Sequence, residues 1–357
     1  MKSVPIIVLS GGPSGGKSKA LRALSEELEK LGLDVICVTE AAQSVLGGGF
    51  DRSRPVYEFQ KAIGLLQLET EKSAKERAGE NSVIICDRGL MDCRVYLDDG
   101  DFERLKSELD LTEVDLRDRY DAVFHLDSTS STDDTKYRTN ELRVESRLEA
   151  REINERSLRA WCGNPHYRFI PVKETFEEKF AILLREVKAF LGIPKPLEIE
   201  RKYLIKYPDL DCLSTLVCSK SHIFQTYLLG ENGRYRLRKR GENGKNIFIK
   251  TVKSKISETV REEVETRLTD EEYEALLKEG AVIGSIEKDR YCLMYGGVYY
   301  EIDVFPFWKH QAYIEVELLS ENDSVVLPEF IELIREVTYD SRYKNSSLCR
   351  SVPAEEI

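Results

Sequence analysis

The sequence predicts an α/β domain over residues 1–193, followed by a mainly antiparallel α+β domain over residues 197–357. In the first half, apolar strand-like runs alternate with amphipathic helical segments, which is typical of a parallel sheet covered by helices. In the second half, charged and apolar residues alternate along short segments, which is the period of a β-strand. The sequence GIPKPL at 192–197 breaks the last helix of the first half and predicts a short, stiff linker.

The composition limits what the chain can do. Its 357 residues are 41% hydrophobic, which is enough for two cores, and no apolar run is long enough to span a bilayer. The eight cysteines form no CxxC pair, and Cys37 and Cys86 fall in apolar strands, so we expect reduced, buried thiols in a cytoplasmic protein. The net charge of −11 argues against a nucleic-acid partner. A peripheral membrane or trafficking partner stays compatible with the sequence.

Hydrophobic periodicity places the elements of both halves. The first half has predicted strands at 5–10, 34–39, 82–87, 120–126 and 169–172, and predicted helices at 17–32, 57–77, about 140–161 and 175–191. In the second half, short strands predominate, with helices expected near 269–278 and 328–337. The first pattern predicts a parallel sheet with helices on both faces.

A phosphate-binding loop follows the first predicted strand. Residues 11–18 read GGPSGGKS and satisfy the signature GxxxxGK[ST]. In this signature, backbone N–H groups surround the phosphates, the lysine reaches the β- and γ-phosphates, and the serine hydroxyl binds Mg²⁺. The predicted nucleotide-binding residues are therefore Gly11, Gly12, Pro13, Ser14, Gly15, Gly16, Lys17 and Ser18, with Ser18 also a metal ligand.

Two further features extend this site. Asp87 ends the strand at 82–87, where a carboxylate would hold Mg²⁺ through water. Arg143, Arg147 and Arg151 lie at helical spacing. Such a helix is either a lid that closes on phosphates or a solvated helix paired with its interleaved glutamates. Both interpretations stay open, and Asp87, Arg143 and Arg147 are the additional nucleotide-binding candidates.

The segments GGPSGGKS, VTEAAQ and IICDRG resemble the P-loop domain shared by NadR-type ribosylnicotinamide kinases and the TRP translocation-defect family. The resemblance covers most of residues 3–190. It implies that the first domain binds ATP or GTP and phosphorylates a small molecule. No NKxD guanine motif is visible, so the sequence does not select between the two nucleotides.

Charged residues occupy alternate positions along the segments of the second half. They are Glu198, Glu200 and Lys202; Arg234, Arg236, Arg238 and Arg240; Lys288 and Arg290; Glu301 and Asp303; and Glu315 and Glu317, while Lys250 closes the apolar run at 247–249. Such strands have one charged and one apolar face. The sheet is either open, with its charged face in water, or closed, with basic and acidic rows facing each other inside.

The segments EIERKYLI, RYRLRKR, FIKTVK, REEVE, IEKDRY, YYEIDVF, YIEVEL and TYDSRYKN, in this order, resemble the CYTH or triphosphate tunnel metalloenzyme superfamily. The match spans residues 197–350, and EIERK corresponds to the ExExK hallmark of that superfamily. The resemblance implies an eight-stranded antiparallel tunnel that binds triphosphates with Mg²⁺ or Mn²⁺. Known activities of the superfamily include inorganic triphosphatase, thiamine triphosphatase, RNA 5′-triphosphatase and adenylate cyclase.

On this basis we expect metal-dependent hydrolysis of a triphosphate or polyphosphate in the second domain. The expected catalytic residues are Glu198, Glu200 and Lys202; the phosphate-binding residues are Lys202, Arg236, Arg238, Lys250, Lys288 and Arg290; and the metal ligands are Glu198, Glu200, Asp303, Glu315 and Glu317. One alternative is a non-catalytic, nucleotide-regulated trafficking protein whose tunnel binds an anionic ligand such as a lipid headgroup. A second alternative is a kinase whose tunnel is vestigial.

Overall fold

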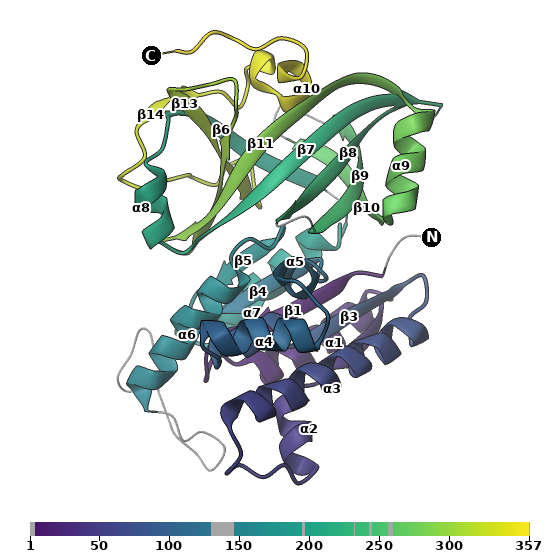
Figure 1. The fold of residues 1–357 in the computed structure, drawn as a ribbon, viewed down its shortest axis with the longest axis vertical. Coiled ribbons are helices and arrows are strands. Elements are labelled where there is room, and N and C mark those ends of the chain that lie inside the picture. The colour runs from purple at the N-terminus through teal and green to yellow at the C-terminus, as the bar shows by residue number, and fades with distance from the viewer. Residues whose placement is uncertain are drawn as a thin grey trace. The chain divides into compact units, whose positions relative to one another are not determined.

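The computed structural model describes residues 4–129, 146–194, 197–231, 233–242, 245–255 and 260–356. The chain divides into two compact units, Met1–Arg185 and Glu186–Ile357 (Figure 1). Among the described residues, no helix is long and apolar enough to cross a membrane.

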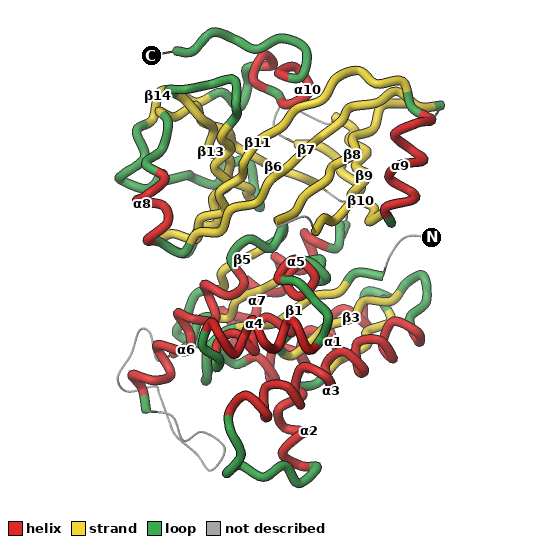
Figure 2. The backbone as a smooth tube through the Cα atoms, viewed as in Figure 1, coloured by secondary structure: helices red, strands yellow, loops and turns green. Residues whose placement is uncertain are grey.

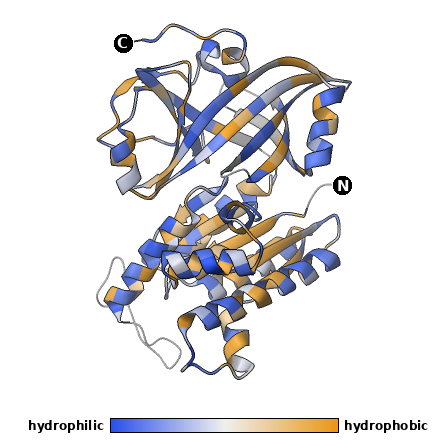
Figure 3. Cartoon of the chain, in the orientation of Figure 1, coloured by the Kyte–Doolittle hydropathy of each residue, from blue (hydrophilic) through white to orange (hydrophobic). Residues whose placement is uncertain are grey.

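The first unit is built on a five-stranded parallel sheet. Its strand order is β2-β3-β1-β4-β5, with bounds β1 Ile6–Ser10, β2 Asp34–Val38, β3 Ser82–Asp87, β4 Ala122–Leu126 and β5 Tyr167–Ile170. The helices are α1 Lys17–Lys30, α2 Ala41–Gly47, α3 Val56–Arg77, η1 Leu90–Val95, α4 Asp99–Glu108, α5 Glu113–Arg117, α6 Arg147–Trp161 and α7 Phe176–Phe190. Strands β1, β3 and β4 are buried along their whole length, as apolar runs in a parallel sheet should be (Figure 3).

Two details of this unit differ from the sequence-based expectation. The last strand ends at Ile170 and begins at Tyr167, two residues earlier than predicted. Cys37 is exposed rather than buried, because its strand β2 is an edge strand with only β3 beside it, whereas Cys86 in β3 is fully buried. The apolar run alone did not distinguish an edge strand from a central one.

The second unit contains one nine-stranded antiparallel sheet. Its strand order is β10-β9-β8-β7-β11-β12-β13-β6-β14. Figure 2 shows the strands of this unit in yellow. The bounds are β6 Leu197–Lys206, β7 Cys218–Gly230, β8 Gly233–Glu242, β9 Lys245–Lys255, β10 Val260–Leu268, β11 Ala281–Tyr295, β12 Val298–Val304, β13 Gln311–Leu318 and β14 Leu333–Glu336, with α8 Leu210–Thr215, α9 Asp270–Glu279, η3 Ser341–Tyr343 and α10 Asn345–Leu348. Because β10 also pairs with the first residues of β6, the sheet closes on itself.

The prediction of a helix at 328–337 is wrong, because this segment contains strand β14. Its apolar residues do recur at helical spacing, but Leu333 and Glu336 pair with Ile205 and Tyr203 of β6. β10 pairs with β6 only near residues 197–199, so the same side of β6 is open to another strand further along. Tertiary pairing therefore overrides local periodicity here.

The closed sheet has two distinct faces. One face carries Tyr203, Ile205, Ile302, Ile314 and Val316, which pack with Leu213 of α8 and with Ile331. On the same side, Leu228 and Leu237 pack under Tyr273 of α9. The other face, here called the inner face, carries Lys202, Arg290, Asp303 and Glu315 together with an aromatic cluster of Phe305, Trp308, Tyr313 and Tyr343.

Candidate phosphate-binding sites

The loop after β1 has the tight backbone of a phosphate-binding loop. Gly11 and Gly16 have φ values of 126° and 84°, in the region that favours glycine. A Cβ at Gly11 would lie 2.3 Å from the Leu126 carbonyl oxygen, and one at Gly15 would lie 2.6 Å from the same atom. The loop therefore needs glycine both for its conformation and for its close approach to the end of β4.

Lys17 and Ser18 occupy the first turn of α1. The Lys17 Nζ donates to the carbonyl oxygens of Gly11 and Gly12 at 2.9 and 2.8 Å. Burial, with a smaller contribution from the nearby Arg88 guanidinium, lowers the pKa of Lys17 to about 7. The Ser18 Oγ donates to Asp87 Oδ2 at 2.6 Å. The two carbonyl dipoles stabilise the Lys17 ammonium only in part. A bound nucleotide would give it a phosphate as an anionic partner.

The predicted magnesium pair is thus brought together. Burial raises the pKa of Asp87 above its usual range, and its Oδ1 atom is buried with no hydrogen-bond partner among the described residues. A hydroxyl and a carboxylate at this place are oxygen donors of the kind that Mg²⁺ prefers. The donor set of Ser18 and Asp87 therefore fits the cation that the loop implies.

Next to the loop lies a charged cluster formed by Glu40, Arg88 and Asp92. Arg88 has a positive φ of 74°, and its Nε donates to Glu40 Oε1 at 2.9 Å. Its Nη1 lies 3.4 Å from both Asp92 Oδ1 and the Gly11 carbonyl oxygen. The segment IICDRG places this arginine directly after Asp87, the candidate Mg²⁺ ligand.

Of the three expected lid arginines, Arg147 and Arg151 lie within the described residues. Arg143 lies outside the described residues, and Arg147 is the first residue of α6. Further along the same helix, Arg151 Nε forms an exposed i,i+4 ion pair with Glu155 at 3.4 Å. At Arg151, the structure therefore has the salt-bridged arrangement that was the alternative to a lid.

The inner face of the closed sheet holds a connected ionic network. Glu315 accepts from Lys202 Nζ at 2.6 Å and from Arg290 Nη2 at 2.7 Å. Asp303 accepts from Arg290 Nε and Nη2, each at 2.7 Å, and from Lys288 Nζ. These side chains are at most 9% exposed. Cross-strand register brings them together, because Arg290 pairs with Asp303 and Lys202 pairs with Glu315.

Burial and charge shift the pKa values in this network in opposite directions. Burial, with repulsion from Arg290, lowers the pKa of Lys288 to about 8. Burial also opposes ionisation of Glu315, but Lys202, Lys288 and Arg290 together hold its pKa well below its usual range. Lys202 has a raised pKa because the attraction of Glu315 and Glu200 outweighs its burial. Lys202, Lys288 and Glu315 are therefore charged at neutral pH.

Two arginines of β8 line another part of the inner face. Arg236 Nη2 donates to Thr251 Oγ1 at 3.0 Å and to Glu265 Oε1 at 3.2 Å. Arg238 Nη1 lies 3.8 Å from the same Glu265 oxygen. Arg236 is buried and Arg238 is half-buried. Because a carboxylate lies between them, both guanidinium groups are oriented toward one region of the face.

Lys250 does not share this face. It pairs directly with Leu237, and its Nζ lies 4.8 Å from the centroid of the Tyr235 ring, on the side covered by α9. Arg236 instead pairs with Thr251, so the inner face continues through Thr251 to Lys253. The sequence analysis expected Lys250 to bind phosphate, but the apolar run before it gave no information about which face of the sheet it occupies.

The expected metal ligands are found in two different settings. Glu200 and Glu317 stand directly opposite each other in the β6–β13 register. Asp303 and Glu315 are instead bound to lysine and arginine, as described above. Glu198 pairs with Arg261 in the register of β6 and β10, but its side chain lies outside the described part. Within the described ranges, no group of three or more His, Cys, Asp or Glu side chains is arranged as a metal site.

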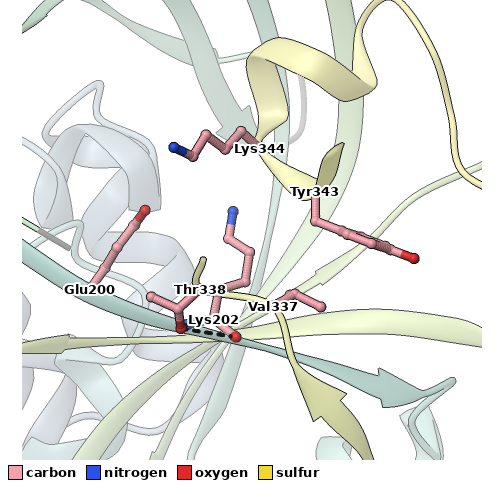
Figure 4. A pocket seen from close by; sticks show the side chains of 6 residues that line it. All are labelled: Glu200, Lys202, Val337, Thr338, Tyr343 and Lys344. Atoms are coloured by element: carbon pink, nitrogen blue, oxygen red, sulfur yellow. Dashed lines mark hydrogen bonds between the residues drawn. The ribbon is translucent and has the colours of Figure 1, made fainter. Parts of the chain in front are cut away.

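Besides Lys253, the sequence analysis missed Lys344. A small pocket is lined by Glu200, Lys202, Val337, Thr338, Tyr343 and Lys344. Figure 4 shows the amino groups of Lys202 and Lys344 and the carboxylate of Glu200 pointing into the same space, while the Tyr343 ring points away. Lys344 lies in the segment TYDSRYKN, which supported the resemblance. It follows the short helix η3, so no alternation of a strand indicated which way its side chain points.

These two sites define the class of the protein: a P-loop domain joined to a closed antiparallel sheet with a charged inner face. Residues 6–179 match the model of the AAA domain family AAA_28, and residues 196–350 match the model of the CYTH domain family. The chain therefore carries a P-loop AAA domain and a CYTH domain, which confirms both resemblances that the sequence suggested.

Solved structures give three further likenesses. A structure described as the hypothetical protein NE1496 is 30% identical over 44% of this chain and 99% of its own, with a TM-score of 0.30. One described as the inorganic triphosphatase NE1496 is 28% identical over 44% and 97%, with a TM-score of 0.29. NadR protein in complex with NR is 19% identical over 53% and 52%, with a TM-score of 0.41. Comparison with curated proteins finds no match.

Proposed function

We propose that the CYTH domain hydrolyses a linear triphosphate or short polyphosphate in a metal-dependent reaction. The observation that carries this proposal is the set of cations from three strands on one inner face: Lys202, Arg236, Arg238, Lys288 and Arg290. Arginine binds phosphate oxygens in a bidentate manner and lysine binds them as a point charge. Lys253 and Lys344 add to this set, by register and by pocket geometry respectively.

A divalent ion fits part of the predicted ligand set. Glu200 and Glu317 face each other across β6 and β13, and like charges directly opposite are destabilising unless a cation lies between them. These two residues would hold Mg²⁺ or Mn²⁺, with Glu198 as the third expected ligand. When bound, such an ion neutralises phosphate charge and acidifies a bound water. Asp303 and Glu315 have a different role, which is to hold Lys202, Lys288 and Arg290 in position.

For the first domain, we propose binding of ATP or GTP with Mg²⁺ and transfer of a phosphoryl group to a small molecule. Gly11 to Ser18 would bind the phosphates, and Asp87 with Ser18 would hold the ion. Glu40, Arg88 and Asp92 lie beside the loop at the carboxyl ends of β2 and β3, where ligands bind in open α/β sheets. They are the candidate residues for the phosphoryl acceptor.

The test of the tunnel proposal is phosphate release from tripolyphosphate by the full chain with Mg²⁺ or Mn²⁺. We expect turnover that stops when the metal is chelated, and turnover in the absence of metal would contradict the proposal. Binding of tripolyphosphate without any release of phosphate would favour the non-catalytic alternative.

The strand β9 offers a matched pair of variants for the same assay. Lys253→Met should raise the KM for tripolyphosphate by about tenfold, because a charge-assisted contact is worth about 1.5–3 kcal/mol. Lys250→Met removes the same charge from the same strand, but on the face covered by α9, and should leave KM within about twofold. A raised KM for Lys250→Met together with an unchanged KM for Lys253→Met would show that the phosphate site is not on the inner face.

A further inference from the structure

Two buried side chains outside the P-loop form hydrogen bonds with its backbone, and no sequence motif identifies them. Lys179 of α7 donates from Nζ to the Gly15 carbonyl oxygen at 2.8 Å and to the Asp127 carbonyl oxygen at 2.6 Å. Asn154 of α6 accepts from the Gly12 N–H at 3.0 Å and donates to Asp127 Oδ1 at 2.9 Å. Both anchors therefore tie the loop to the end of β4.

These contacts lie in a buried, tightly packed region. Asn154 and Lys179 are only 5% and 8% exposed. A Cβ at Gly12 would lie 2.7 Å from the Asn154 Cβ, so backbone and side chain are already as close as a glycine permits. Burial lowers the pKa of His125 to about 3, so its imidazole is neutral, and its Nε2 lies 3.2 Å from Asn154 Oδ1. The loop has little room to move away from these anchors.

The contact of Lys179 with Gly15 has a direct consequence for phosphate binding. The Gly15 carbonyl and the Gly16 N–H belong to one planar trans peptide, so they point in opposite directions. Fixing the carbonyl oxygen on the Lys179 ammonium therefore points the Gly16 N–H to the other side of the loop. In the P-loop signature, backbone N–H groups of this segment are the donors to phosphate oxygens.

We propose that Lys179 is a positioning residue of the nucleotide site, which orients the Gly16 N–H toward bound phosphate while Asn154 anchors Gly12. This inference rests on the proposed binding of nucleotide by the first domain. It adds a second lysine to the site, distinct from Lys17 of the loop itself. Lys17 reaches the phosphates directly, whereas Lys179 acts through the backbone of the loop.

The experiment is calorimetric titration of the full chain with Mg-ATP, Mg-GTP and AMP. Lys179→Met should weaken binding of the preferred triphosphate about tenfold, which corresponds to about 1.4 kcal/mol. AMP should lose less than about threefold, since it presents fewer phosphate oxygens to the loop. Lys179→Arg should restore most of the affinity, because it keeps a charged donor. Arg185→Met is the matched control, since it removes one exposed charge from the same helix.

The possible outcomes distinguish failure of this inference from failure of the proposed nucleotide binding. If the wild-type chain binds neither ATP nor GTP, the proposed nucleotide function fails. If the wild type binds and Lys179→Met binds equally well, the positioning role is overturned. An equal loss for AMP and triphosphate, or failure of Lys179→Arg to recover, also overturns it, because both indicate general loss of structure. Should Lys179→Met not fold, Asn154→Ala carries the test, with a smaller loss for triphosphate expected and an unchanged affinity refuting it.

Discussion

Asp303→Asn separates the two roles that a carboxylate on the inner face can have. Asp303 is fully buried and accepts three hydrogen bonds, two from Arg290 at 2.7 Å and one from Lys288. An uncharged amide would leave these two cations with one counter-charge fewer and would turn an N–H₂ group toward their donors. Breaking a buried ion pair in this way costs about 3–5 kcal/mol.

That cost is large enough to measure in the thermal unfolding of the second unit. For a domain of this size, 1 kcal/mol shifts Tm by about 2–4 °C, so Asp303→Asn should lower Tm by about 6–20 °C in the absence of metal. Lys288 already has its pKa lowered to about 8, so it can lose its proton in the variant, which keeps the cost toward the lower end. Adding Lys288→Met to the variant should recover part of the loss.

The assay is circular dichroism during heating in chelator at about pH 7, and the control is Glu317→Gln. Glu317 is exposed, so its neutralisation should leave Tm nearly unchanged. If Asp303→Asn matches this control, Asp303 is not a counter-charge for Lys288 and Arg290. It would then belong with the metal ligands, as the sequence pattern had suggested.

Three further predictions follow from the two sites. Lys17→Ala should weaken ATP or GTP binding about 10- to 100-fold while phosphate release by the CYTH domain stays at the wild-type level, and unchanged affinity in calorimetry would contradict the assignment of the loop. The first unit should lose stability as the pH falls from about 6.5 toward 3, because burial lowers the pKa of His125 to about 3 and holds that of His166 well below its usual range, so the unfolded chain binds more protons in that window. The slope should reach about 1.4 kcal/mol per pH unit for each histidine, and His125→Gln should reduce it; an unchanged slope in that variant would contradict the prediction. A fragment of residues 195–357 should be folded and β-rich by circular dichroism, and an aggregating fragment would argue against an independent core.

The P-loop could be located from the sequence because its chemistry is local. Eight consecutive residues carry the glycines, the lysine and the hydroxyl, and the strand before and helix after them are set by periodicity alone. The supports of the loop could not be found in this way. Asn154 and Lys179 lie far along the chain from Gly12 and Gly15, and only the fold brings them together.

On the closed sheet, the alternation of charge predicted which residues share a strand face but not which partner each one meets. The pairing of Arg290 with Asp303, and of Lys202 with Glu315, depends on cross-strand register, and register is set by turns and packing. The same limit explains why the sequence did not show that Lys250 lies on the face opposite the inner face, because a shift of one residue along a strand reverses the face. Strand β14 depends on the free part of β6, which no local pattern reveals.

The most direct test of the account is the metal dependence of tripolyphosphate hydrolysis by the double variant Glu200→Gln, Glu317→Gln. Phosphate release and Tm would be followed against Mn²⁺ concentration for the variant and the wild type. The account predicts that the variant loses metal-dependent turnover and metal-induced stabilisation, while it still unfolds cooperatively in chelator, because the two facing carboxylates are the expected metal ligands. Wild-type turnover together with the same rise in Tm on adding Mn²⁺ would contradict it.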